Sequence, residues 1–318
     1  MKISLARLPT PIEYLARLSK QYGREIFVKR DDLTEFISSG NKIRKLEFLL
    51  ADALKNGCNM VFTCGGIQSN HARATAHLAV KLGLKPVLFL RQPATVDKEL
   101  INGNLLLDEL LGATIIPVTT QQYAKIEEIY EEYKKDYESR GYKVYTIPEG
   151  GSNSLGALGY LFAVAEIATQ IDLSTVDAIY CAVGSGGTYA GLIAGLRYLG
   201  YKTPVVGINV TKTKAERFVE KIEEIIAGMS QFGVDVKVSS EEIIILDEYS
   251  GPDYAVPSDA DIDCIRIVAS TEGIVLDPVY TAKAFRGMLQ NSRRSQRLLF
   301  IHTGGTFGIF AQAFRFAH

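Results

Sequence analysis

The sequence predicts an α/β fold with largely parallel sheets, and three observations support this prediction. Short runs of β-branched and apolar residues alternate with longer segments in which apolar residues recur at helical spacing. Several of the short runs are apolar throughout, which is typical of strands covered on both faces. The 318 residues, 47% hydrophobic and 22% charged, correspond to about two globular domains and exclude a disordered or fibrous chain.

This alternation predicts the elements in chain order. Strands are expected at 24–29, 60–64, 86–90, 114–118, 143–147, 178–183, 204–210 and 298–303. Helices are expected at 42–56, 70–82, 99–111, 123–139, 155–170 and 188–199. In 123–139, Ile and Tyr recur at helical spacing among Glu and Lys residues, which indicates an amphipathic surface helix. The uncharged segment 178–196 is long enough to cross a membrane, but its five glycines favour a buried strand, a tight loop and a helix.

Charge and cysteine content narrow the class of partner. Lys and Arg number 35 against 36 Asp and Glu, without a block of one sign, so we expect a small-molecule partner and neither nucleic acid nor a membrane. The four cysteines form no CxxC pair and no cluster with metal-ligand spacing, so we expect reduced, mostly buried thiols and no metal. The N-terminal segment lacks the continuous apolar core of a signal peptide, and a cytoplasmic protein is expected.

Five junctions between a strand or loop and a helix carry unusual residues, in a fold that binds ligands at such junctions. The first is the segment 38–46, where Gly40-Asn41 is a plausible helix start that places Lys42 in the first turn. The helix field, Arg44 and Lys45 should lower the pKa of Lys42 and favour the neutral amine that attacks an aldehyde. The alternative is an ordinary solvated lysine.

The second junction, between the strand at 60–64 and the helix at 70–82, is rich in polar side chains. Ser69 is a natural N-cap, and a helix start offers free N–H groups to an anion. The alternative is a cap without further function. Because Gln68, Asn70 and His71 make the segment more polar than a cap requires, a ligand loop is favoured.

The third junction has the pattern of a phosphate cradle, since glycines follow an apolar strand and open a helix. Its residues are Gly184, Ser185, Gly186, Gly187 and Thr188. The dinucleotide-binding pattern has glycine at the position of Tyr189 and an acidic residue at the end of the next strand, where this sequence has Asn209. A phosphate site without a dinucleotide is therefore predicted.

The fourth and fifth junctions lie near the C-terminal end, at 276–281 and 302–306. Considered alone, Tyr280 is predicted to pack in the core and His302 to be a structural histidine with its hydrogen bonds satisfied. The pair Gly304-Gly305 follows a strand and indicates a close approach of a ligand to the backbone.

Taken together and in this order, the motifs resemble those of pyridoxal-phosphate (PLP) enzymes of the tryptophan-synthase-β fold type. More narrowly, they are similar to the D-cysteine desulfhydrase and 1-aminocyclopropane-1-carboxylate (ACC) deaminase family. The resemblance runs from Leu8-Pro9-Thr10-Pro11 through Lys29-Arg30-Asp31-Asp32 and the five junctions to His302-Thr303-Gly304-Gly305, which is nearly the whole chain.

The resemblance implies pyridoxal 5'-phosphate as the cofactor and a role for each matching residue. Lys42 matches the lysine that binds the cofactor aldehyde and moves protons at the substrate Cα. The other implied cofactor contacts are Lys45, Asn70, Gly184, Ser185, Gly186, Gly187, Thr188, Tyr280, Thr281 and Thr303, and the implied substrate contacts are Gln68, Ser69, Asn70, His71, Tyr254, Thr281 and Thr303. Ser69 and Tyr280 are expected to act in catalysis together with Lys42.

Two positions discriminate within the family. Where ACC deaminases carry Glu and Leu, this sequence has Thr281 and Thr303, as the D-cysteine desulfhydrases do. The expected reaction is therefore α,β-elimination of D-cysteine to pyruvate, hydrogen sulfide and ammonia. ACC deamination is disfavoured, cysteate desulfonation is not excluded, and a non-catalytic or nucleotide-binding α/β protein is the alternative of another class.

The resemblance also implies the architecture. Two open, twisted, largely parallel α/β domains are expected, a larger one at 1–45 and 156–318 and a smaller one at 46–155. Members of this group are commonly homodimers, so a homodimer acting on a small amino acid is expected.

Overall fold

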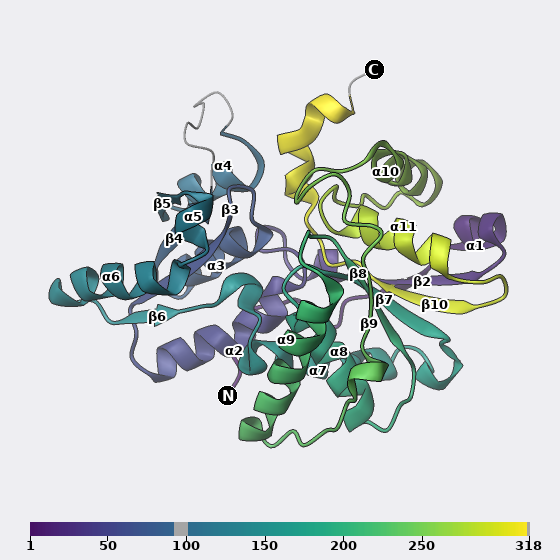
Figure 1. The fold of residues 1–318 in the computed structure, drawn as a ribbon, viewed down its shortest axis with the longest axis horizontal. Helices are drawn as coiled ribbons and strands as arrows, with labels where there is room; N and C mark the ends of the chain where they lie inside the picture. Colours follow the sequence, from purple (N-terminus) through teal and green to yellow (C-terminus); the bar gives the residue numbers. More distant parts are fainter. Residues whose placement is uncertain (92–100, 317–318) are drawn as a thin grey trace.

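Two parallel sheets dominate the computed structural model, which describes residues 1–91 and 101–316 (Figure 1). The six-stranded sheet has the order β1-β2-β10-β7-β8-β9 and the four-stranded sheet the order β5-β4-β3-β6. The strands are β1 (Ile12–Tyr14), β2 (Glu25–Lys29), β3 (Met60–Gly66), β4 (Lys85–Arg91), β5 (Thr114–Val118), β6 (Val144–Thr146), β7 (Ala178–Val183), β8 (Val205–Asn209), β9 (Ile244–Leu246) and β10 (Arg297–Ile301). Every pair is parallel except β1 with β2. The predicted α/β class with largely parallel sheets is thus confirmed.

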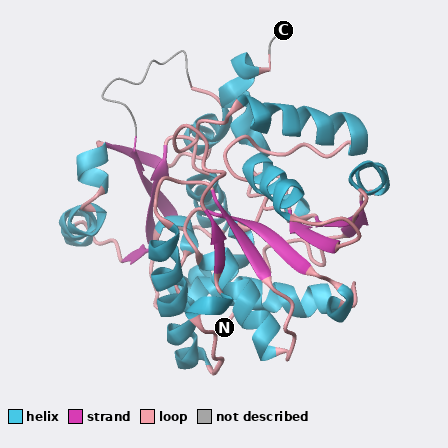
Figure 2. Ribbon diagram, turned by 45° about the vertical axis from the view of Figure 1, so that its right-hand side comes forward, coloured by secondary structure: helices cyan, strands magenta, loops and turns pink. Residues whose placement is uncertain are grey.

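Helices lie on both sides of the sheets (Figure 2). They are α1 (Ala16–Tyr22), α2 (Lys42–Lys55), α3 (Asn70–Lys81), α4 (Gly103–Leu110), α5 (Thr120–Tyr123), α6 (Ile126–Ser139), α7 (Ser154–Ala168), α8 (Gly187–Tyr198), α9 (Ala215–Gly228), α10 (Asp259–Glu272) and α11 (Thr281–Asn291). Several short 3₁₀ turns connect them, among them η1 (Asp31–Leu33), η3 (Glu149–Gly151) and η7 (Thr306–Arg315).

The central strand β7 shows why a continuous apolar run predicts a buried strand. All six of its residues are buried between β10 and β8. Successive side chains point to opposite faces of a strand, so Ile179 and Cys181 enter the core beneath α7 and α8, whereas Tyr180 and Ala182 enter the core beneath α10 and α11. Both faces of the sheet are covered, and no position on β7 needs a polar side chain.

Most predicted elements appear within one or two residues of their expected bounds. The uncharged segment 178–196 forms β7, a glycine loop and most of α8, as predicted, and no helix in the described part of the chain is long and apolar enough to cross a membrane. The predicted helix 99–111 begins at Gly103, with residues 99 and 100 outside the described range. The predicted helix 123–139 is interrupted at Ala124–Lys125, because Thr119 caps a separate short turn, α5.

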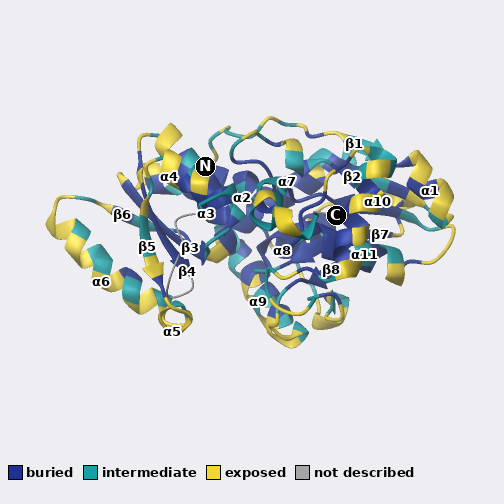
Figure 3. Ribbon diagram, turned by 90° about the horizontal axis from the view of Figure 1, so that it is seen from above, coloured by how far each residue is buried: buried dark blue, intermediate teal, exposed yellow. Residues whose placement is uncertain are grey.

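Close packing of α2, α7 and α8 sets the position of the residues at the start of α2. A Cβ on Gly159 of α7 would lie 2.3 Å from the carbonyl oxygen of Arg44, and one on Gly191 of α8 would lie 2.3 Å from that of Ala157. Only glycine allows these backbones to approach so closely. The three helices form a continuous buried region between the two sheets (Figure 3).

A buried ionic cluster joins α2 to the larger sheet. The guanidinium of Arg44 donates two hydrogen bonds of 2.8 Å to Asp31 and two of 2.9 Å to Glu166 of α7. Asp31 also accepts hydrogen bonds from Tyr160 and Thr10. Although burial raises the pKa of Asp31, the charge and hydrogen bonds of Arg44 hold this pKa below its ordinary value, so Asp31 is an anion. The cluster fixes the turn of helix that follows Lys42.

All four cysteines are buried as free thiols, as expected. They are Cys58, Cys64, Cys181 and Cys264. Burial raises the pKa of each thiol above its ordinary value, to about 11 for Cys64 and about 12 for Cys181 and Cys264. They therefore pack as small apolar side chains.

Candidate active site

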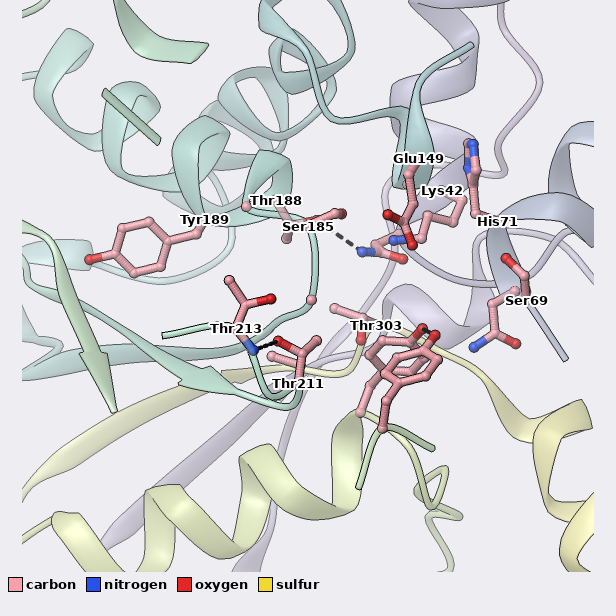
Figure 4. Close-up of a pocket in the computed structure, with 18 of the residues that line it drawn as sticks. Lys42, Ser69, His71, Glu149, Ser185, Thr188, Tyr189, Thr211, Thr213 and Thr303 are labelled. Carbon is pink, nitrogen blue, oxygen red and sulfur yellow. Dashed lines mark hydrogen bonds between the residues drawn. The ribbon is translucent and has the colours of Figure 1, made fainter. Parts of the chain in front are cut away.

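The carboxyl ends of strands from both sheets surround a cavity of about 650 Å³ (Figure 4). Ligands bind at this end of parallel strands because loops and helix N-termini converge there. Of the residues predicted from the sequence, the cavity is lined by Lys42, Ser69, Asn70, His71, Gly184, Ser185, Gly186, Thr188, Tyr254, Tyr280 and Thr303. Lys45, Gln68, Gly187 and Thr281 lie outside the lining.

Lys42 is the first residue of α2 and faces the cavity. The turn before it requires Gly40, whose φ is +109° and whose Cβ would lie 2.4 Å from the carbonyl oxygen of Thr303. Asn41 donates a hydrogen bond of 2.9 Å to the Thr188 hydroxyl. The residue next to Lys42 is thus tied to the glycine loop that follows β7.

Burial lowers the pKa of Lys42 to about 8, against the opposing charges of Glu149 and Asp277. The sequence predicts this direction but attributes it to the helix field and to Arg44 and Lys45. In the structure Arg44 is neutralised by its two carboxylates, and removal from water is the largest cause. The neutral amine required for attack on an aldehyde is therefore substantially populated near pH 8.

Replacing Glu149 with glutamine is expected to lower the pKa of Lys42 below about 8, because the negative charge of Glu149 raises it. The measurement is the pH dependence of the rate at which the apoprotein captures an aldehyde, followed by absorbance. The midpoint should move to lower pH in Glu149→Gln and should stay in place in Glu132→Gln on the exposed face of α6. An unchanged midpoint in Glu149→Gln would contradict the electrostatic coupling.

The glycine loop after β7 leaves the N-terminus of α8 open to the cavity. Gly186 has a φ of +85° and offers no side-chain cap; the Gly187 N–H donates a hydrogen bond of 3.2 Å to Ser152 Oγ, and no described side chain accepts from the N–H groups of Thr188 and Tyr189. A Cβ on Gly187 would lie 2.6 Å from Ser152 Oγ, which is 2.8 Å from Ser185 Oγ. Uncapped N–H groups at a helix start bind anions such as phosphate.

Lys45 supports this loop from behind instead of lining the cavity. Its Nζ donates hydrogen bonds of 3.1 Å to the Gly150 carbonyl oxygen and to Ser152 Oγ. Burial is the largest cause that lowers the pKa of Lys45 well below its ordinary value, and the nearby charges of Lys42 and Lys221 lower it further. Lys45 thus reaches the glycine loop through the Ser152 hydroxyl, and its implied direct contact with a phosphate stays a prediction.

Three of the four polar residues of the loop after β3 line the cavity, and Ser69 and Asn70 are two of them. Ser69 caps α3 as predicted, accepting a hydrogen bond of 3.1 Å from the Ala72 N–H. Asn70 Oδ1 accepts a hydrogen bond of 2.9 Å from Asn104 of α4. Both side chains are held by these bonds and face the cavity.

The other two polar residues of this loop are positioned differently. His71 Nε2 lies 2.9 Å from the Thr63 hydroxyl, and burial lowers the pKa of His71 so that the ring is neutral. Gln68 turns away from the cavity, because its amide bonds with the backbone of Asn102 and Asn104. Gln68 lies outside the lining of the cavity, and its implied substrate contact stays a prediction.

Two tyrosines and one threonine complete the side of the cavity formed by the larger sheet. The hydroxyl oxygens of Tyr254 and Tyr280 lie 2.7 Å apart, and burial raises the pKa of both, so both hydroxyls keep their protons. Thr303 follows β10 and lines the cavity. Thr281 is fully buried, with its hydroxyl donating a hydrogen bond of 2.7 Å to Asp277, and does not reach the cavity.

Sequence reasoning misses Glu149 and Arg91, which also line the cavity. Glu149 follows the strand at 143–147, and this strand end is the signal that could have identified it. Arg91 ends β4 at the same edge of the sheet. Tyr123 of α5 also lines the cavity, but its spacing in 123–139 indicates only a packing residue.

Asn209 argues against a dinucleotide at this site. The side chain is buried, and it bonds with the Thr213 carbonyl, with Asp247 and with the Thr211 N–H and hydroxyl. All these bonds shape the loop after β8, and the amide of Asn209 stands where a dinucleotide site has the carboxylate that binds a ribose.

The fold and the site define a class of α/β enzyme that holds an anionic group at a helix N-terminus and presents a poorly solvated lysine to it. Residues 3–304 match the family described as "Pyridoxal-phosphate dependent enzyme", and the chain belongs to this family. A non-catalytic or nucleotide-binding protein, the alternative of another class, is thereby excluded.

Two relatives narrow the family further. A Thermotoga maritima protein, provisionally named a 1-aminocyclopropane-1-carboxylate deaminase, is 57% identical over 99% of both chains. A crystal structure described as that of an ACC deaminase homologue is 40% identical with a TM-score of 0.88, and the match covers 99% of this chain and 94% of the other. A threonine deaminase structure shares the fold, with 21% identity and a TM-score of 0.66. The match covers 93% of this chain and 92% of the other.

The residues present fit PLP. The uncapped start of α8 suits its phosphate, and the amine of Lys42 suits its aldehyde. A Cβ on Gly184 would lie 3.1 Å from the ring of Tyr280, so glycine keeps this wall open. The chemistry of the donor set therefore agrees with the cofactor that the family uses.

Proposed function

We propose that the protein catalyses the α,β-elimination of D-cysteine. The Cα–H and Cβ–S bonds break, and with one water the products are pyruvate, hydrogen sulfide and ammonia. PLP, when bound, accepts the electron pair left at Cα. The established part of this function is that the chain is a PLP-dependent enzyme of the ACC deaminase and D-cysteine desulfhydrase family.

The residues of the cavity support specific roles in this reaction. Lys42, whose pKa burial lowers to about 8, suits a base that removes the Cα proton near neutral pH. Ser69 and Asn70 stand at the N-terminus of α3, where a substrate carboxylate would be stabilised. The protonated hydroxyls of Tyr254 and Tyr280 suit a proton donor to the departing sulfur.

The residue at position 281 is the observation that favours D-cysteine over ACC as the substrate. The family resemblance implies Glu there in ACC deaminases, whereas this chain has Thr281, bonded to Asp277. Because Thr281 does not reach the cavity, position 281 supplies no carboxylate to the cofactor ring, which leaves a weaker electron sink; loss of thiolate needs less delocalisation than opening a cyclopropane. ACC deamination remains the second candidate, since the names of the Thermotoga maritima relative and of the 40% identical crystal structure favour it. Cysteate desulfonation is the third.

A product assay with D-cysteine, L-cysteine, D-serine, ACC and cysteate in parallel tests the proposal. Sulfide and pyruvate are expected to form fastest from D-cysteine. Faster formation of 2-oxobutanoate from ACC would replace D-cysteine by ACC as the substrate, and faster release of sulfite would replace it by cysteate. Sulfide release from L-cysteine at an equal or higher rate would overturn the stereochemical assignment.

Three further features belong to this proposal. The protein is a homodimer, as the family resemblance suggests, and cytoplasmic, as its four free thiols suggest. Its larger domain comprises 1–45 and 156–318 and its smaller domain 46–155, with the four-stranded sheet in the smaller one. Size-exclusion chromatography with light scattering tests the dimer, and limited proteolysis tests the domain limits.

A further inference from the structure

Arg91 places a cation beside the loop that is proposed to bind the substrate carboxylate. It is the last residue of β4, in register with Gly66 of β3, and its carbonyl oxygen accepts a hydrogen bond from the Ile67 N–H. The side chain is half-buried and lines the cavity together with Lys42. Arg91 therefore faces the space next to the α3 N-terminus.

Two aromatic rings hold the guanidinium group. Its Cζ lies 5.0 Å from the ring centroid of Tyr123 and 5.3 Å from that of Tyr254. Both rings attract a cation over their faces, and a guanidinium stacked in this way still presents its N–H groups at its edge. Tyr254 itself is bonded to Tyr280. The contact therefore places the cation next to the proposed proton donors.

Within the described part of the chain, no residue occupies the N–H groups of the Arg91 guanidinium, so they are available to a ligand. No described residue accepts a hydrogen bond from the Arg91 side chain, and Glu149 and Asp253, the acidic residues of the lining, form no ion pair with it. Of the other lining cations, Lys42 is proposed to bind the cofactor, and Lys212 donates to the Gly251 carbonyl. Arg91 is thus the cation positioned for the substrate.

We propose that Arg91 binds the group on Cβ of the substrate and stabilises the negative charge that this group carries as it departs. This inference rests on the proposed elimination and deepens it by naming the substrate class, which is an amino acid whose β-substituent leaves as an oxyanion or thiolate. Hydrosulfide from cysteine and sulfite from cysteate both meet this description. The ring of ACC carries no such group and releases none, so Arg91 favours elimination over ring opening.

The experiment measures binding separately from turnover. The holoenzyme is titrated with D-aspartate, which carries a β-carboxylate, and with D-alanine, which carries none, and the absorbance change of the bound cofactor gives both dissociation constants. In Arg91→Gln the affinity for D-aspartate should fall about tenfold or more, while that for D-alanine should stay within about twofold. Arg91→Lys should retain part of the preference, because it keeps the charge but loses the planar fork.

Arg140→Gln is the matched control, since Arg140 also stacks on a tyrosine, at 4.9 Å from the Tyr137 ring, but is exposed on α6. It should change neither affinity. Equal losses for D-aspartate and D-alanine in Arg91→Gln, or no loss, would overturn the role of Arg91 even if sulfide is released. A selective loss for D-aspartate without elimination from any amino acid tested would uphold this role and overturn the proposed reaction.

Discussion

Replacing Lys42 with alanine is expected to reduce kcat by a factor of about 10³ or more. The substitution removes both the amine proposed to bind the cofactor aldehyde and the proposed base at Cα. The side chain faces the cavity beside the loop at 184–188, and the structure offers no second lysine in the described lining except Lys212, whose amine donates to the Gly251 carbonyl. The measurement is the rate of pyruvate formation at saturating substrate.

A covalent readout makes this prediction independent of activity. After treatment with borohydride, mass spectrometry should find the cofactor attached to a peptide containing Lys42 in the unmodified protein and should find no attachment in Lys42→Ala. Lys135→Ala, on the exposed face of α6, is the control and should behave as the unmodified protein. Attachment at another lysine in the unmodified protein would remove Lys42 from the mechanism.

Replacing Asp31 with asparagine is expected to lower the free energy of unfolding by about 3–5 kcal/mol. The two side chains have nearly the same shape, but the amide cannot accept hydrogen bonds at both of its terminal atoms. Arg44 would then retain only Glu166 as a counter-charge, and either Tyr160 or Thr10, which donate to different oxygens of Asp31, would lose its acceptor. Equilibrium chemical denaturation under reversible conditions measures the loss.

The control for Asp31→Asn is Asp136→Asn, which breaks an exposed pair with Arg140 and should cost less than about 0.5 kcal/mol. A loss below about 1 kcal/mol for Asp31→Asn would mean that the cluster contributes little. The pH dependence supplies a second check. Burial alone would raise the pKa values of Asp31 and Glu166. Arg44 holds both pKa values below their ordinary values of 3.8 and 4.5. Their stabilisation is therefore complete above about pH 5 and is lost as the pH falls through the lower folded-state values.

The sequence predicts well those elements whose signal is local. Strands such as β7 are continuous apolar runs, and the helix start at Ser69 has the capping residue that a helix requires. By contrast, β1 and β9 have three residues each at the edges of the larger sheet, and so short a run carries no periodicity. The break between α5 and α6 was missed because the apolar spacing continues across it.

For the active site, the sequence predicts which residues lie near the cavity better than it predicts where their side chains point. The motifs bring Lys42 and the glycine loop together as predicted, but Gln68 and Thr281 point elsewhere because distant partners compete for their polar atoms. Those partners, Asn102 and Asp277, cannot be paired with them from spacing alone. Arg91 stands in no recognisable motif, and only the register of β4 with β3 places it in the cavity.

The four inaccessible thiols have a consequence for a protein proposed to release hydrosulfide. Exposed thiolates are readily oxidised to disulfides or sulfenic acids, and hydrosulfide or free cysteine attacks these oxidised forms to give persulfides and mixed disulfides. None of Cys58, Cys64, Cys181 and Cys264 offers a reactive thiolate, since all are buried and the pKa of each is raised. The folded chain is thereby chemically inert towards the sulfur species that its own turnover would accumulate.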